Sequence, residues 1–154
     1  MTDNRCSPNA VSDAGLSLTV SADPEAAGEA SRRVGEWVER AVHPGAERAS
    51  DIVLAAYEAL ANCADHAYRN HDGPGPMTVD AAYDIDTSTV HLCVSDHGRW
   101  VDPHSQPADI ARGRGLQLMK ALCDDFSVNG TESGTTVCLD FGNCFRCAVT
   151  PRPV

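Results

Sequence analysis

The sequence predicts an α+β domain, a two-layer sandwich in which helices cover one face of a mixed, mostly antiparallel sheet. Several short segments alternate apolar and polar residues, and this period of two is typical of half-buried strands. Two longer segments repeat apolar residues with the period of a helix. Because strands and helices fall into separate groups along the chain, we expect the helices to pack on one side of the sheet.

The N-terminal half is expected to supply the first strand and both long helices. Residues 16–20 alternate apolar and polar side chains, which predicts a strand. An aspartate followed by a proline opens residues 23–42, a pattern typical of a capped helix start. The apolar stripe of this helix includes Trp37, which favours a protein interface there. A second helix is expected over residues 50–68, with Ser50 as its N-cap.

The C-terminal half is expected to add two hairpins, with a loop and a shorter helix between them. The expected segments are strands at 77–83 and 89–95, a loop at 96–112, a helix at about 115–123, and strands at 126–129 and 135–141. We therefore expect one folded domain at 16–141. A flexible leader at 1–15 would precede it, and a peripheral C-terminal tail at 142–154 would follow it.

The composition limits the classes of function. The chain has 154 residues, a formal net charge of −10 and a pI near 4.8. Because binding to a phosphate backbone needs an excess of Lys and Arg, we expect no direct contact with nucleic acid. We also expect no membrane contact and a cytoplasmic location. No apolar run approaches the roughly 18 residues of a membrane span, and the first residues lack a signal-peptide pattern.

The seven cysteines are expected to be thiols. Their number is odd, and Cys63, Cys93, Cys123 and Cys138 lie inside expected helices and strands. This distribution favours buried thiols in a reducing compartment over a disulfide framework. The single C-x-x-C motif, at residues 144–147, lacks the second pair that a structural zinc site needs, so we expect it to be dispensable.

The second predicted helix carries a polar stripe with a carboxylate and an amide one turn apart. Glu58 and Asn62 share this stripe, while apolar residues cover another face. The stripe is either a solvated polar face, as in most amphipathic helices, or a functional one. In the functional interpretation Asn62 supplies an oxygen ligand to Mg²⁺ and Glu58 is a base, since Mg²⁺ needs few protein oxygens besides water and phosphate.

Three glycine-containing segments give weaker signals. Residues 96–98 are Asp-His-Gly at a strand end. They form either a plain turn or a binding site in which the Asp96 carboxylate accepts a hydrogen bond from an adenine amino group. Residues 113–115, Gly-Arg-Gly before a helix, could direct amide groups at a phosphate. Leu118 stands where a dinucleotide fingerprint needs a third glycine, and no P-loop is present, so both of those folds are excluded. Two threonines open the last strand, for which β-propensity is a sufficient explanation.

In this order and spacing, the segments resemble the sequence boxes of the histidine-kinase/gyrase/Hsp90 ATPase superfamily, in the form found in anti-sigma-factor serine kinases. EALANCADHAY at 58–68 resembles the N box, and VSDHG at 94–98 resembles the first glycine box. RGRGLQLM at 112–119 resembles the second glycine box, and GTTV at 134–137 the closing box. The resemblance covers residues 16–141, which is nearly all of the expected domain.

The resemblance implies a Bergerat-type ATP site between the helices and the sheet, closed by a lid at 98–112. Asn62 would hold Mg²⁺, Glu58 would activate the attacking hydroxyl, and Asp96 would bind adenine. Thr135 would help to bind adenine through water. The other residues expected near the nucleotide are His66, Arg69, Gly98, Gly113, Arg114, Gly115 and Leu116.

For function, the resemblance implies a homodimeric, ATP-binding anti-sigma factor with serine/threonine protein kinase activity. It would sequester a sigma factor and phosphorylate an anti-anti-sigma protein of the STAS type. One alternative is a non-catalytic ATP-dependent binding module, and another is an interaction protein that needs no nucleotide. Arg99-Trp100 departs from the family pattern, which has a further glycine there. Glu58 and Asn62 together favour the kinase, because phosphoryl transfer needs both a base and a metal.

Overall fold

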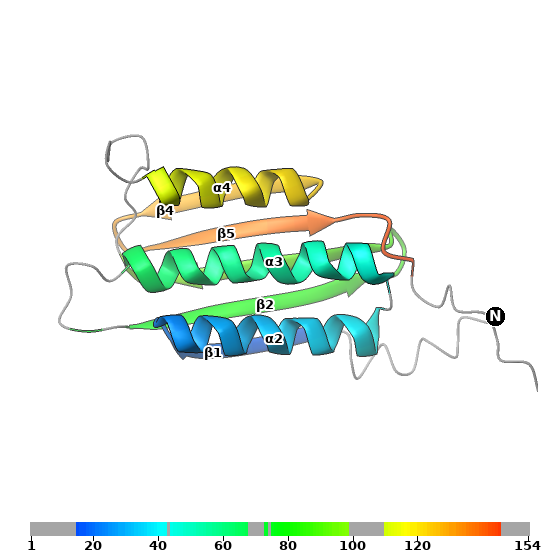
Figure 1. Ribbon diagram of the computed structural model, residues 1–154, viewed down its shortest axis with the longest axis horizontal. Helices are drawn as coiled ribbons and strands as arrows, with labels where there is room; N and C mark the ends of the chain where they lie inside the picture. The colour runs from blue at the N-terminus through cyan, green and yellow to red at the C-terminus, as the bar shows by residue number, and fades with distance from the viewer. Residues whose placement is uncertain (1–14, 43, 68–72, 74, 99–109, 146–154) are drawn as a thin grey trace, which may run out of the picture.

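The predicted α+β sandwich is confirmed. The computed structural model describes residues 15–42, 44–67, 73, 75–98 and 110–145, with the backbone alone for 66–67 and 110–114. In chain order its elements are β1 (Gly15–Ser21), α2 (Pro24–Ala41), α3 (Ala46–Asn62), the π-helix η2 (Cys63–Ala67), β2 (Pro76–Asp84), β3 (Thr89–Asp96), α4 (Ile110–Leu122), β4 (Asp125–Thr131) and β5 (Gly134–Phe141). Helices α2, α3 and α4 lie side by side over the sheet (Figure 1).

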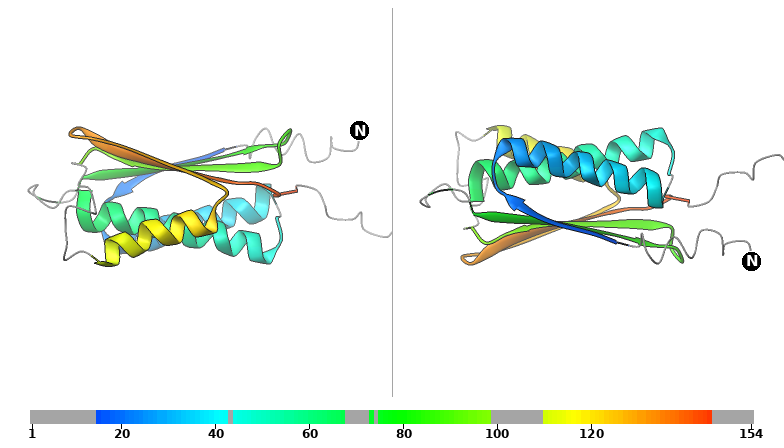
Figure 2. Two further views of the ribbon diagram at one scale, coloured as in Figure 1. Left: turned by 90° about the horizontal axis from the view of Figure 1, so that it is seen from above. Right: turned by 90° about the horizontal axis from the view of Figure 1, so that it is seen from below.

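The sheet order is β1-β2-β3-β5-β4, and every described neighbouring pair is antiparallel. All three α-helices cover the same face of the sheet, and the opposite face carries no described helix (Figure 2). Strands β3 and β5 are neighbours although α4 and β4 lie between them in the chain. This crossover brings the C-terminal end of β3 beside the N-terminal end of β5.

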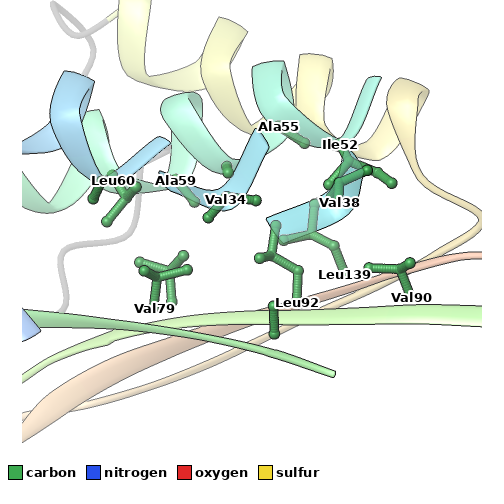
Figure 3. Packing of buried hydrophobic residues seen from close by; sticks show 14 of the residues in the cluster. Val34, Val38, Ile52, Ala55, Ala59, Leu60, Val79, Val90, Leu92 and Leu139 are labelled. Carbon is green, nitrogen blue, oxygen red and sulfur yellow. The ribbon is translucent and has the colours of Figure 1, made fainter. Parts of the chain in front are cut away.

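The core fills the space between the two layers. Along β3, every second side chain is buried against the helices, as the period of two predicts. Figure 3 shows the contributions of α2, α3, β2, β3 and β5, namely Val34, Val38, Ile52, Ala55, Ala59, Leu60, Val79, Val90, Leu92 and Leu139. Trp37 belongs to the same cluster and is fully buried. Trp37 is therefore a core residue and cannot mark an interface, while the placement of the first helix at an interface stays a prediction.

The start of α2 is as predicted, but the start of α3 is not. Asp23 caps α2 by accepting the amide N–H of Ala26 at 2.8 Å. Helix α3 begins at Ala46 after Gly45, with no side-chain cap, so the prediction of Ser50 as its N-cap is wrong. The reason is a set of tertiary contacts made by the first turn of α3.

Arg48 supplies those contacts. Its guanidinium donates to the carbonyl oxygens of Gly142 at 3.1 Å and Leu122 at 3.2 Å, and it forms an ion pair with Asp124. The same group lies over the ring of Phe141, 5.4 Å from its centroid. Arg48 therefore joins the start of α3 to the ends of α4 and β5.

Helix α4 begins at Ile110, five residues before the expected start at Gly115. Both Gly113 and Gly115 thus lie inside the helix, so the prediction of two glycines just before it is wrong. Glycine is a poor helix former, which is why the sequence patterns favoured a later start. Gly115 lies beyond the first four residues, whose amide groups are the ones left free at a helix N-terminus.

The structure also corrects two expectations about cysteines. Cys93 and Cys138 form a disulfide between β3 and β5, so the prediction that all cysteines are thiols is wrong. The two residues stand directly opposite each other in the ladder, a proximity that sequence spacing does not reveal. Cys144 is buried in the core and donates its amide N–H to Ser88 at 2.9 Å, so the expected tail is not peripheral at this point.

None of the helices in the described part of the chain combines the length and the hydrophobicity that a membrane crossing needs.

Candidate functional site

The candidate residues meet where the end of α3, the end of β3 and the start of β5 lie close to α4. Asp96 is the last residue of β3, and Thr135 is its partner on β5 in the ladder. Glu58 and Asn62 lie in the last two turns of α3. Gly115 of α4 lies next to these two side chains. The fold therefore brings together residues that are up to 77 positions apart, from Glu58 to Thr135.

Asp96 is a carboxylate held inside the protein. Its side chain faces the helices, and the residue is only 8% exposed. Oδ1 accepts the amide N–H of Gly98 at 2.9 Å, and Oδ2 accepts the thiol of Cys63 at 3.3 Å. The Asp-x-Gly turn is thus formed. A carboxylate has about four acceptor positions, so these two bonds leave capacity for a further donor such as an amino group.

Cys63 is a contact that the sequence patterns missed. It opens the π-helix η2 directly after Asn62, and π-helical turns are frequent at functional sites. Burial raises the pKa of the Cys63 thiol, and the charge of Asp96 and the hydrogen bond to it raise it further. The thiol therefore stays protonated and acts as a donor to Asp96. Its position immediately after Asn62 was the only available signal.

The polar stripe of α3 lies against the backbone of α4. A Cβ atom built on Gly115 would lie 3.3 Å from Glu58 Oε1 and 3.4 Å from Asn62 Oδ1. Glu58 and Asn62 are both half-buried. At these two residues the stripe packs against α4, and Gly115 allows the close approach of the two helices. Leu116, the next residue, is partly buried against the core.

Gly134 fixes the geometry at the start of β5. It has a positive φ of 156°, and a Cβ there would clash with the carbonyl oxygen of Asp96. Only glycine allows β5 to begin so close to the end of β3. The sequence patterns placed Gly134 directly before the last strand, but the contact with Asp96 depends on the pairing of two strands distant in the sequence.

Other expected residues are described in part or not at all. Gly98 is buried, and its amide N–H is bonded to Asp96. Only the backbone is described for His66 in η2 and for Arg114 in α4, and Gly113 also lies in α4. Arg69 and the lid residues 99–109 lie outside the described residues.

Comparison with known proteins identifies the family. Residues 20–141 match the model of the histidine kinase-like ATPase domain. The chain belongs to this family. The match includes every described element from α2 to β5, and it confirms the resemblance that the sequence boxes indicated.

Solved structures agree with this assignment. The chain is similar to the crystal structure of the RsbU and RsbW domains of Rv1364c from Mycobacterium tuberculosis, with a TM-score of 0.64 and 26% identity over 82% of this chain. It spans 32% of that longer chain. The histidine kinase domain of the blue-light activated histidine kinase EL346 from Erythrobacter litoralis has the same fold, with a TM-score of 0.50 and 19% identity over 75% of this chain and 60% of that one. No curated protein matches the sequence.

A histidine kinase-like ATPase domain implies ATP binding, and the described residues fit such a ligand. Asp96 keeps acceptor capacity for an amino group, as adenine requires. Asn62 and Glu58 provide oxygen atoms of the kind that Mg²⁺ prefers. The space at Gly115 is one that a methyl group would fill.

Proposed function

We propose that this chain is an ATP-binding anti-sigma factor with serine/threonine protein kinase activity. It sequesters a sigma factor and phosphorylates an anti-anti-sigma protein of the STAS type, as a homodimer in the cytoplasm. The observation that carries the proposal is the approach of Gly115 to both Glu58 and Asn62. The family assignment and the likeness to a structure that contains an RsbW domain support it.

The adenine end of the site is assigned to Asp96 and Thr135. Asp96 accepts the adenine amino group with the lone pairs that remain after its bonds to Gly98 and Cys63. Thr135, its neighbour across the ladder, adds a hydroxyl that reaches the base through water. The residues assigned to the rest of the nucleotide are His66, Arg69, Gly98, Gly113, Arg114, Gly115 and Leu116.

The phosphate end is assigned to the polar stripe of α3. Asn62 holds Mg²⁺ through its side-chain oxygen, and this ion, when bound, neutralises phosphate charge. Glu58 accepts the proton of the substrate serine hydroxyl at a carboxylate oxygen. A positioned base of this kind contributes about 10² to 10⁴ in rate, whereas most of the remaining catalysis comes from positioning and charge stabilisation.

The decisive test separates binding from transfer in the Glu58→Gln variant. We expect it to bind Mg-ATP nearly as well as the wild type, because the amide keeps the size of the side chain. Transfer of radiolabelled phosphate to candidate anti-anti-sigma proteins should fall by about 10² or more. Glu47→Gln, a change in the exposed first turn of the same helix, is the matched control and should transfer at the wild-type rate. Wild-type transfer by Glu58→Gln would refute the role of Glu58.

The same assay decides between the kinase and the binding-module alternative. The alternative is favoured by Arg99-Trp100, which stand where the family pattern has a further glycine. A wild-type protein that binds ATP but phosphorylates no candidate would support the binding module. A protein that binds no ATP would leave only the nucleotide-independent alternative.

A further inference from the structure

On the open face of the sheet, a covalent bond joins the neighbouring strands β3 and β5. Cys93 and Cys138 are paired in the ladder and joined by a disulfide. The residues that flank Cys93, Leu92 and Val94, are buried toward the helices. Because successive side chains of a strand point to opposite faces, the disulfide lies on the face that no described helix covers (Figure 2).

The surroundings of this disulfide are polar and open to solvent. His91 and Asp140 lie on the same face as the disulfide, each two residues from a cysteine. His91 Nδ1 and Asp140 Oδ1 are 2.7 Å apart, and the two side chains are 44% and 36% exposed. On the neighbouring strand, Asp80 stands opposite Cys93 and accepts the hydroxyl of Ser17. Both cysteines are only half-buried. The disulfide therefore lies outside the core between the two layers, on the side of the sheet from which a thiol in solution can approach.

Three cysteines in the described part of the chain are free: Cys123 is partly exposed, whereas Cys63 and Cys144 are buried. Burial raises the pKa of the thiols of Cys63 and Cys144, and both are bonded inside the core. Because the thiolate is the reactive form, these two thiols are protected from exchange chemistry. The fold thus separates two buried, protonated thiols from one accessible pair.

We propose that Cys93 and Cys138 form a reversible redox site whose partners are dithiol reductants and disulfide oxidants. In reduction, a thiolate of the dithiol attacks one sulfur of the Cys93–Cys138 bond and forms a mixed disulfide. The second thiol of the reductant then attacks this mixed disulfide and releases the protein sulfur as a thiol. Two electrons and two protons pass to the protein, which gains two thiols, and the reductant becomes a disulfide. Oxidation is the reverse exchange.

This site is distinct from the proposed nucleotide site, although the two share strands. Cys93 is three residues from Asp96 on β3, and Cys138 is three residues from Thr135 on β5. An odd offset along a strand places the side chains on opposite faces. The redox site would therefore stand even if the proposed kinase function failed, since its argument uses no nucleotide-binding residue.

Thiol trapping on the native protein tests the proposal. The oxidised protein is treated with dithiothreitol or buffer, then with iodoacetamide, and each cysteine peptide is quantified by mass spectrometry. We expect Cys93 and Cys138 to become labelled after dithiothreitol, while Cys63 and Cys144 stay unlabelled until a denaturant is added. Oxidised glutathione, added after removal of the reductant, should restore the bond. Circular dichroism checks that the reduced protein stays folded.

Two results would overturn the proposal. One is a pair that is reduced only in denaturant, which would make the bond purely structural, and the other is a pair that does not re-form with oxidised glutathione.

The Cys138→Ser variant gives an independent measurement, because it leaves Cys93 unpaired, and Cys93 should then form a mixed disulfide with glutathione. Failure of Cys93 to react would also count against the site. Cys123→Ser, which removes an unpaired cysteine, is the matched control and should keep the reversible couple.

Discussion

Removal of the disulfide should lower the free energy of unfolding by about 4 kcal/mol. The bond closes a loop with a sequence separation of 45 residues. In the chain-entropy model, a loop of this length removes about 13 cal/mol/K from the unfolded ensemble, which is about 4 kcal/mol at 25 °C. For a domain of this size each kcal/mol shifts the midpoint of thermal unfolding by about 2 to 4 °C, so the double variant Cys93→Ser with Cys138→Ser should melt roughly 8 to 16 °C lower.

The assay is urea and thermal unfolding of the oxidised wild type, the reduced wild type and the double variant. Reduced wild type and double variant should agree, because both lack the same constraint. Cys123→Ser should unfold like the oxidised wild type, since Cys123 is unpaired. The bond is confirmed by mass before each measurement. If the oxidised and reduced proteins differed by less than about 1 kcal/mol, the entropic reasoning would be refuted for this pair.

Three further substitutions test the site. Cys63→Ala should weaken ATP binding about tenfold by calorimetry, because a hydrogen bond to charged Asp96 contributes roughly 1.5 kcal/mol. Cys63→Ser should retain the affinity. Equal affinity for the alanine variant would contradict the donor role. Gly115→Ala should weaken ATP binding without loss of fold, and Gly28→Ala, with nothing within 4 Å, should bind normally and gain up to about 1 kcal/mol of stability. Gly134→Ala should reduce both thermal stability and ATP affinity because of the clash with the Asp96 carbonyl; unchanged melting would refute that geometry.

Local patterns predicted most of the fold because most elements obey local rules. The strands follow the period of two, and Asp23 caps α2 as the aspartate-proline pair indicates. The starts of α3 and α4 were not predictable in the same way. Arg48 fixes the first through contacts with Gly142 and Leu122. The second lies before two glycines, Gly113 and Gly115, whose low helix propensity favours a later start.

The same distinction applies to the candidate site. The helical period places Glu58 and Asn62 on one stripe, and the sequence therefore predicts their proximity. It does not predict that Asp96 and Thr135 pair, because β3 and β5 are neighbours only through a crossover. The hydrogen bond from Cys63 and the disulfide of Cys93 were missed for a related reason: each depends on strand placement and register, which sequence spacing alone leaves open.

The register of β3 against β5 is the feature on which both proposals depend. One pairing sets Asp96 opposite Thr135 on the helical face and Cys93 opposite Cys138 on the open face. A shift of one residue would move each side chain to the other face, so it would expose Asp96 and bury the cysteines together. The disulfide allows one register only, since its two residues must stay opposite. The disulfide on the open face therefore favours the same register that places the buried carboxylate assigned to adenine.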